Sequence, residues 1–286
     1  MEVSTLVLAR TRAELRDRVA AWRRQGQLIG FVPTMGALHQ GHAALVRRAR
    51  AECDRVVVSI FVNPTQFGPN EDFDRYPRTE DADRALLESL GVDLLFAPPV
   101  REIYPPGDST RVVVGSVAEP MEGERRPGFF TGVATVCTRL FALVSPDRAY
   151  FGEKDWQQLL VVRRLVEDLG LPLTIEAVAT VREADGLALS SRNAYLSPAE
   201  RAVAPLLHRC LVEAAEALRA GEPFPPVRER AVQRLVRSGF AAPDYLDLRD
   251  EGTLVPLAAA RPGARLFIAA RLGATRLIDN LAVPLG

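Results

Sequence analysis

The stretch that most constrains the fold runs from residue 28 to residue 48. A short apolar run ends at Pro33, a glycine-containing turn follows, and a helical pattern begins around His39–Ala43. A helix N-terminus presents unpaired N–H groups and the positive end of the peptide dipole, so it suits a phosphate. The stretch carries His39 and His42, two of the three histidines, and their spacing lets both imidazoles face one ligand.

Strand and helix patterns alternate on both sides of this stretch. Residues 55–62 are β-branched and apolar on both faces, as expected of a central parallel strand. We predict strands at 28–32, 55–62, 92–96, from 147 to a charged turn before 155, and 173–181, and helices at 11–25, 42–53, 79–90, 133–144 and 156–169. This alternation predicts an α/β fold, a Rossmann-type doubly wound parallel sheet.

Two segments interrupt the alternation. Residues 98–132 are rich in Pro and Gly and are predicted to contain a small sheet with a strand at 111–114, and the Arg125–Arg126 tip is expected to approach an anion. Residues 182–193 are polar and contain glycine, so we predict a mobile loop or hinge.

From Ser197 the pattern changes to that of a second domain. Ser197-Pro198 with Glu200 is a helix start, with an N-cap serine and proline at the first helical position. Helices at 198–220 and 226–238 are expected to precede strands at 244–248, 264–270 and 275–281. We therefore predict a Rossmann-type ligand-binding domain over 1–181 and a smaller α+β domain over 182–286.

Charge and cysteine content exclude several classes of protein. The 36 basic residues balance 36 acidic ones, so no global basic field favours nucleic acid. Three distant cysteines argue against a disulfide framework and a CxxC metal site. No apolar run is long enough to span a bilayer, and no signal peptide is visible. We expect a cytoplasmic protein that binds neither nucleic acid nor membrane.

Polar residues cluster where the predicted strands end. The clusters are Thr34–His42, Asn63–Gln66, Gly152–Gln158 and Arg182–Asn193. Open α/β sheets bind ligands at the carboxyl ends of their strands, so the clusters predict one site.

The histidine pair has three interpretations. His39 and His42 are spaced like a zinc pair, but no third ligand is close in sequence. They are alternatively a purely structural pair. We favour a third reading, in which the imidazoles stabilise charge on a leaving pyrophosphate, and Gly36 and Gly41 let the backbone approach the ligand.

Each of the other clusters, considered alone, has both a functional and a structural interpretation. Lys154 is suited to bind phosphate oxygens, and Asp155 is suited to bind a ribose or a magnesium ion. Without the other clusters, the two residues would be interpreted as a surface ion pair. Ser190, Ser191 and Arg192 suit a phosphate clamp or an ordinary loop. Asn63 and Gln66 suit a small polar substrate or a turn cap. No P-loop and no GxSxG nucleophile elbow is present.

Four blocks in collinear order resemble the pantothenate synthetase (pantoate–β-alanine ligase) family. They are PTMGALHQGH (33–42), SIFVNPTQF (59–67), FGEKDWQQ (151–158) and DGLALSSRN (185–193). The resemblance implies an ATP-dependent ligase that condenses (R)-pantoate with β-alanine through pantoyl adenylate, releasing pyrophosphate and AMP. It also implies a cytoplasmic, magnesium-dependent homodimer with a mobile C-terminal lid.

The resemblance also implies roles for individual residues. His42, His39, Lys154 and Arg192 would be catalytic, and Gln66, Gln158, Asn63 and Thr34 would bind pantoate or β-alanine. Asp155 would contact a magnesium ion held mainly by ATP phosphates. The ATP site would comprise Met35, Gly36, Ala37, Leu38, His39, Gln40, Gly41, His42, Gly152, Glu153, Lys154, Asp155, Val181, Leu189, Ser190, Ser191 and Arg192.

One position departs from the family pattern, and two other functions stay open. Phe129 follows Arg-Pro-Gly where the family usually has histidine. A nucleotidylyltransferase would use the same strand, HxGH turn and helix, and a nucleotide-binding regulatory domain would need no catalytic residues. Asn63, Gln66 and Gln158, read as a hydroxy-acid pocket, favour the ligase.

Overall fold

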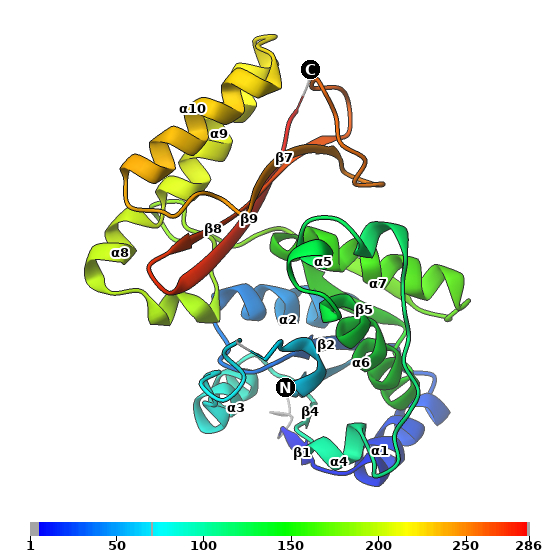
Figure 1. Ribbon diagram of the computed structural model, residues 1–286. Helices are drawn as coiled ribbons and strands as arrows, with labels where there is room; N and C mark the ends of the chain where they lie inside the picture. Colours follow the sequence, from blue (N-terminus) through cyan, green and yellow to red (C-terminus); the bar gives the residue numbers. More distant parts are fainter. Residues whose placement is uncertain (1–5, 70, 285–286) are drawn as a thin grey trace. The chain divides into compact units, whose positions relative to one another are not determined.

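The computed structural model describes residues 6–69 and 71–284, which form two compact units (Figure 1). The first unit holds the chain as far as Glu153, together with Gln157–Ala179. The second holds Lys154–Trp156 and the chain from Thr180 onward. The two predicted domains, 1–181 and 182–286, differ from these units mainly at Lys154–Trp156, and their boundaries stay a prediction.

The first unit is built on a six-stranded sheet in the order β1-β4-β3-β2-β5-β6, with every pair parallel. Its strands are β1 (Val7–Ala9), β2 (Ile29–Thr34), β3 (Arg55–Ile60), β4 (Leu94–Phe96), β5 (Arg148–Gly152) and β6 (Thr174–Val178). The strand order reverses between β2 and β5, which is the switch point where doubly wound sheets bind ligands. The predicted Rossmann-type fold is confirmed.

Helices cover both faces of this sheet. They are α1 (Arg12–Arg24), α2 (Gln40–Glu52), α3 (Glu80–Ser89), α4 (Val100–Ile103), α5 (Glu122–Arg125), α6 (Phe129–Val144) and α7 (Trp156–Asp168). Side chains alternate along β2: Val32 belongs to a core cluster with Leu45 of α2, whereas Phe31 makes an edge-to-face contact with Phe141 of α6. Alternate residues point to opposite faces, so α2 and α6 lie on opposite sides of β2.

Residues 98–132 contain no sheet, so the predicted strand at 111–114 is wrong. The amide of Val112 donates to Thr135 Oγ1 on α6 instead of to a strand, and Val113 is 74% exposed. The segment instead forms α4, α5 and a 3-10 turn, η2 (Ser116–Ala118). Helix α6 begins four residues earlier than predicted, directly after Gly128, which has a φ of 86°. Strand β1 was not predicted.

The second unit is an antiparallel sheet packed with helices, as predicted. Strand order is β7-β8-β9, and α9 and α10 bury a leucine-rich core against it. The elements are η4 (Ser191–Tyr195), α8 (Pro198–Val203), α9 (Leu206–Arg219), α10 (Phe224–Arg237), β7 (Tyr245–Asp250), β8 (Ala264–Leu272) and β9 (Thr275–Ala282). The helix predicted over 198–220 is broken near Pro205, which lacks the N–H that would continue the helical hydrogen bonds.

The segment predicted as a mobile loop or hinge contains a short hairpin. Arg182 pairs with Ala188 in an antiparallel bridge, and the amide of Leu189 donates to Val181 O at 3.0 Å. Arg201 of α8 ties the hairpin down through ion pairs with Glu183 at 2.6 Å and Asp185 at 2.7 Å. Over the described residues, no helix is both long and apolar enough to cross a membrane.

Candidate active site

The turn after β2 requires glycine at position 36. Gly36 has a φ of 85°, in the left-handed region that favours glycine. A Cβ there would lie 3.0 Å from Ile60 Cγ2 and 3.2 Å from Asp83 Oδ2. Thr34 closes the start of the turn, since its hydroxyl donates to Ser59 O at 2.7 Å and accepts from the Gly36 amide at 3.2 Å.

A buried carboxylate that was not predicted holds the same turn. Asp83 on α3 is 3% exposed and accepts from the amides of Ala37 at 2.9 Å and Leu38 at 2.7 Å. Both amides lie in the turn between β2 and α2, so the carboxylate supplies acceptors that a strand or helix would otherwise provide. Asp83 therefore shapes the Met35–Leu38 segment of the predicted ATP site. It lies more than 40 residues away in sequence, and no motif marks it.

Replacing Asp83 by asparagine should loosen this turn. The amide keeps one acceptor but sets an NH2 group against the other backbone N–H, and an unsatisfied buried donor costs about 1–3 kcal/mol. We expect the KM for ATP to rise about tenfold, the equivalent of about 1.4 kcal/mol, and the melting temperature to fall. Steady-state kinetics at varied ATP checks this. An unchanged KM for ATP would contradict a role for Asp83 in shaping the ATP turn.

His39 and His42 cap the helix that follows. His39 is the N-cap of α2, and its Nδ1 accepts from the Gly41 amide at 3.1 Å. His42 returns the contact, because its Nδ1 accepts from the His39 amide at 3.3 Å. The two ring centroids are 4.1 Å apart. The pair forms a capping box in which imidazoles replace the usual serine and glutamate.

This capping fixes where each imidazole carries its proton. A backbone N–H is always a donor, so each Nδ1 must be an unprotonated acceptor, and the proton lies on Nε2. Each ring therefore carries an Nε2–H donor at the N-terminus of α2. No group of three or more His, Cys, Asp or Glu side chains that could hold a metal ion occurs in residues 6–69 and 71–284.

A relay of amides orients Gln66 at the end of β3. Asn63 is 1% exposed, and its Oδ1 accepts from the Thr65 amide, the Thr65 hydroxyl and the Tyr104 hydroxyl. Its Nδ2 then donates to Gln66 Oε1 at 2.8 Å and to Gly132 O at 3.2 Å. With Oε1 engaged as an acceptor, the Gln66 side chain keeps its Nε2 as the donor.

Asn63 is consequently a positioning residue, which revises the expectation that it contacts substrate. Its two donors and its oxygen are all used inside the protein. Gly132 of α6 fits closely against the same turn, η1 (Pro64–Gln66): a Cβ there would lie 2.3 Å from Thr65 O. Neither Gly132 nor Tyr104 was predicted.

The adjacent glutamines on α7 have different environments. Gln157 is 5% exposed and donates to Val117 O at 2.9 Å and Pro120 O at 2.7 Å, which fastens the segment before α5. Gln158 is half-buried, and no hydrogen bond of its side chain is found among the described residues. Gln158 thus differs from Gln157 in having no side-chain hydrogen bond among the described residues, and its contact with a substrate stays a prediction.

Arg126, one of the two arginines predicted to approach an anion, is engaged inside the protein. It pairs with Glu71 through two hydrogen bonds, of 2.7 and 2.6 Å, and donates to Gln66 O at 3.2 Å. Its guanidinium lies 3.7 Å from the centroid of the Phe129 ring. Phe129, the departure from the family pattern, therefore stacks on the arginine that supports Gln66.

Gly152 at the end of β5 stands in open space. A Cβ there would meet no heavy atom within 4 Å, so packing does not require the glycine. Close approach of a ligand to the backbone would require it.

Of the remaining predicted residues, Glu153 belongs to the first unit, and Lys154, Asp155, Val181 and Leu189–Arg192 belong to the second. The turn η3 (Glu153–Asp155) places the Lys154 side chain, 19% exposed, with its Nζ 3.7 Å from Asp155 Oδ1. Val181 and Leu189 form the last rung of the hairpin. Ser190 then caps η4, its hydroxyl accepting from the Arg192 amide at 3.3 Å, so Ser190–Arg192 lie on one tight turn.

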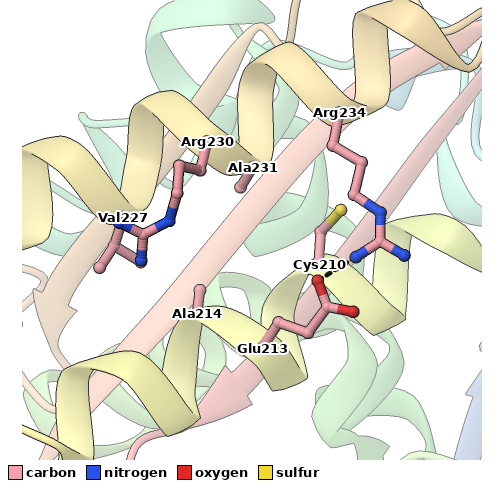
Figure 2. Close-up of a pocket in the computed structure, with 7 residues that line it drawn as sticks. All are labelled: Cys210, Glu213, Ala214, Val227, Arg230, Ala231 and Arg234. Carbon is pink, nitrogen blue, oxygen red and sulfur yellow. Dashed lines mark hydrogen bonds and ion pairs between the residues drawn. The ribbon is translucent and has the colours of Figure 1, made fainter.

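A cavity of about 260 Å³ between α9 and α10 is lined by none of these residues (Figure 2). Cys210 lines it, together with Glu213, which pairs with Arg234. Burial raises the pKa of the Cys210 thiol to about 11, which makes it a poor nucleophile. Cys53 and Cys137 are also free thiols.

Comparisons with known proteins agree over nearly the whole chain. The family described as pantoate-beta-alanine ligase matches residues 7–282. The chain is 56% identical to a pantothenate synthetase of Cereibacter sphaeroides, covering 96% of this chain and 98% of that one. It superposes on a Thermus thermophilus pantothenate synthetase with a TM-score of 0.92 and 54% identity, over 98% and 99% of the two chains. A Francisella tularensis pantoate-beta-alanine ligase, in complex with beta-gamma ATP and β-alanine, gives a TM-score of 0.84 and 35% identity over 99% of each chain.

Proposed function

Because the chain belongs to the pantoate–β-alanine ligase family, it joins pantoate to β-alanine, and we propose that the His39–His42 turn activates ATP for this reaction. The observation that carries the proposal is the reciprocal cap, which sets the proton of both imidazoles on Nε2 at a helix N-terminus. The ligase family matches residues 7–282, so the two alternative functions, a nucleotidylyltransferase and a nucleotide-binding regulatory domain, are not supported.

In the first step a carboxylate oxygen of pantoate attacks the α-phosphorus of ATP. A new P–O bond forms, the bond to the bridging oxygen breaks, and pyrophosphate leaves with that electron pair. The attacking carboxylate is already ionised at neutral pH, so the step needs no base. It needs neutralisation of charge on the phosphates, and the two Nε2–H groups with the α2 dipole supply donors for it.

In the second step the ammonium group of β-alanine first loses a proton to solvent, and the neutral amine attacks the acyl carbon of pantoyl adenylate. The amide bond forms, AMP leaves, and the nitrogen loses a proton to solvent or to AMP. An acyl adenylate hydrolyses readily in water, so the site must hold it until the amine arrives.

In this proposal, Gln66 and Gln158 select the substrate pantoate. Gln66 donates through Nε2 to an oxygen of pantoate, and Gln158 holds the same substrate from the first turn of α7. Lys154 and the Ser190–Arg192 turn, carried by the second unit, neutralise phosphate oxygens.

The residues of the proposed site are compatible with a magnesium ion that binds together with ATP. A magnesium ion is commonly held by one or two carboxylates together with substrate phosphates and water. Asp155, 46% exposed, is one such carboxylate. Magnesium would neutralise phosphate charge when bound, and the protein would add no more than this ligand. We also propose a homodimer in the cytoplasm, consistent with three free thiols.

A pyrophosphate-release assay tests the proposal. With ATP and pantoate alone we expect release of pyrophosphate approximately stoichiometric with enzyme, because the adenylate stays bound. Adding β-alanine should give continuous turnover and equal amounts of AMP and pantothenate. Absence of pyrophosphate in both mixtures would exclude the adenylation mechanism, and AMP formation from ATP without pantoate would indicate a different substrate.

A further inference from the structure

The segment that carries Lys154 is built into the C-terminal unit. Lys154–Trp156 follow β5 directly in sequence and are continued by α7, yet these three residues pack with the unit that begins at Thr180. A lysine expected to act on phosphates is thus held by residues more than 90 positions further along the chain.

Two buried side chains of the C-terminal sheet make this attachment. Asn280 of β9, 5% exposed, donates from Nδ2 to Lys154 O at 2.9 Å. Arg265 of β8 donates to Asn280 Oδ1 at 2.8 Å, which orients the amide so that Nδ2 faces the lysine carbonyl. The same arginine lies 3.5 Å from the centroid of the Trp156 ring.

Glu251 completes the attachment. Its backbone carbonyl accepts from Trp156 Nε1 at 2.8 Å, and its carboxylate lies 3.2 Å from Arg265 Nη2. The segment is therefore held at a carbonyl, at a ring face and at an indole N–H.

The side chain of Lys154 is left out of this network. Within the described part of the chain, the one ionic partner of its Nζ is Asp155 Oδ1 at 3.7 Å. The backbone is fixed while the ammonium remains available, the arrangement that suits a group required to meet a phosphate at one defined place. Displacement by about 1 Å costs such a group on the order of 100-fold in rate.

We infer that Asn280 and Arg265 are positioning residues for Lys154. Through this lysine, the C-terminal unit sets the rate of adenylation. This inference rests on the proposed role of Lys154 at the phosphates. Asn280 and Arg265 act through the backbone of Lys154–Trp156, so their loss should lower kcat and leave ground-state binding of pantoate nearly intact.

The test compares Asn280→Ala and Asn280→Asp with wild type in pyrophosphate release. Aspartate keeps the acceptor for Arg265 but cannot donate to Lys154 O, so both variants should lower kcat about 10- to 100-fold, with KM for pantoate changed less than about threefold. Arg276→Ala is the matched control: Arg276 lies on the same strand and pairs with Asp244 at 2.7 Å. It should lower the melting temperature and leave kcat within about twofold of wild type.

A double-mutant cycle separates positioning from general destabilisation. In the Lys154→Ala background, Asn280→Ala should change single-turnover adenylation less than about twofold, since the group it positions is absent. Equal effects in both backgrounds, or a kcat near wild type for Asn280→Ala and Asn280→Asp, would overturn the inference. A near wild-type rate for Lys154→Ala alone would instead refute the proposed role of the lysine.

Discussion

Replacing His42 by alanine is expected to lower the rate of pyrophosphate release about 100- to 1,000-fold, the usual cost of removing one preorganised donor to a developing charge. The substitution removes the Nε2–H donor and also the acceptor that caps the His39 amide. Loss of an N-cap acceptor costs about 1 kcal/mol, so the protein should still fold. Rapid-quench measurement of adenylate formation, with the melting temperature in parallel, checks both effects.

Two further variants distinguish the role of His42 Nδ1, which caps the helix, from the role of Nε2, which is proposed as a donor. An asparagine side chain places an oxygen near the position of Nδ1 and so keeps the cap, but it cannot reach the position of Nε2. Glutamine places an amide N–H near Nε2 and loses the cap. We expect His42→Asn to be as slow as His42→Ala but more stable, and His42→Gln to recover part of the rate. A His42→Asn enzyme with near wild-type rate would show that the Nε2 donor is not required.

Substituting Gly132 by alanine is expected to impair catalysis although Gly132 is proposed to touch no substrate. The new Cβ would lie 2.3 Å from Thr65 O and 3.1 Å from the Gln66 amide, so helix α6 or the η1 turn must move. Gln66 moves with the turn, and a displacement near 1 Å should reduce kcat/KM for pantoate on the order of 100-fold. Kinetics at varied pantoate give the size of the loss, and the KM for ATP should change much less.

Gly115→Ala provides the matched control for this prediction. Gly115 has a φ of −88°, and a Cβ there would meet only Glu119 Oε1 at 3.7 Å, an ordinary contact. This variant should keep kcat/KM for pantoate within about twofold of wild type. If Gly132→Ala were equally active, the close fit between α6 and η1 would have no role in orienting Gln66.

The sequence predicts those parts of the fold that depend on residue patterns within a short span of the chain. The β2–turn–α2 stretch and the apolar β3 are recognisable because strand period, glycine and helix period follow one another over a short span of chain. Strand β1 escapes detection because three residues carry too little pattern, and its partner β4 lies more than 80 residues away. The run at 111–114 looks like a strand because of its valines, yet it pairs with no strand among the described residues.

The same division holds for the site. His39 and His42 are predictable because the helix start that orients them is adjacent in sequence. Asp83, Gly132 and Asn280 are not, since each acts on a backbone group that only the folded chain brings near. Lone Asp, Gly and Asn residues occur throughout any globular sequence. Without the partner, nothing distinguishes a supporting residue from a surface one.

The fixed orientation of the Gln66 amide has a consequence for inhibitor design. A compound that offers an ether, hydroxyl or carbonyl oxygen to Nε2 leaves the Asn63–Gln66 bond in place. A compound that offers an N–H must turn the Gln66 amide over. That rotation sets Gln66 Nε2 against Asn63 Nδ2, and the Thr65 amide prevents Asn63 from turning in response. If Gln66 binds the substrate as proposed, selection against donor-bearing ligands depends on the backbone N–H of Thr65, which holds Asn63 in place.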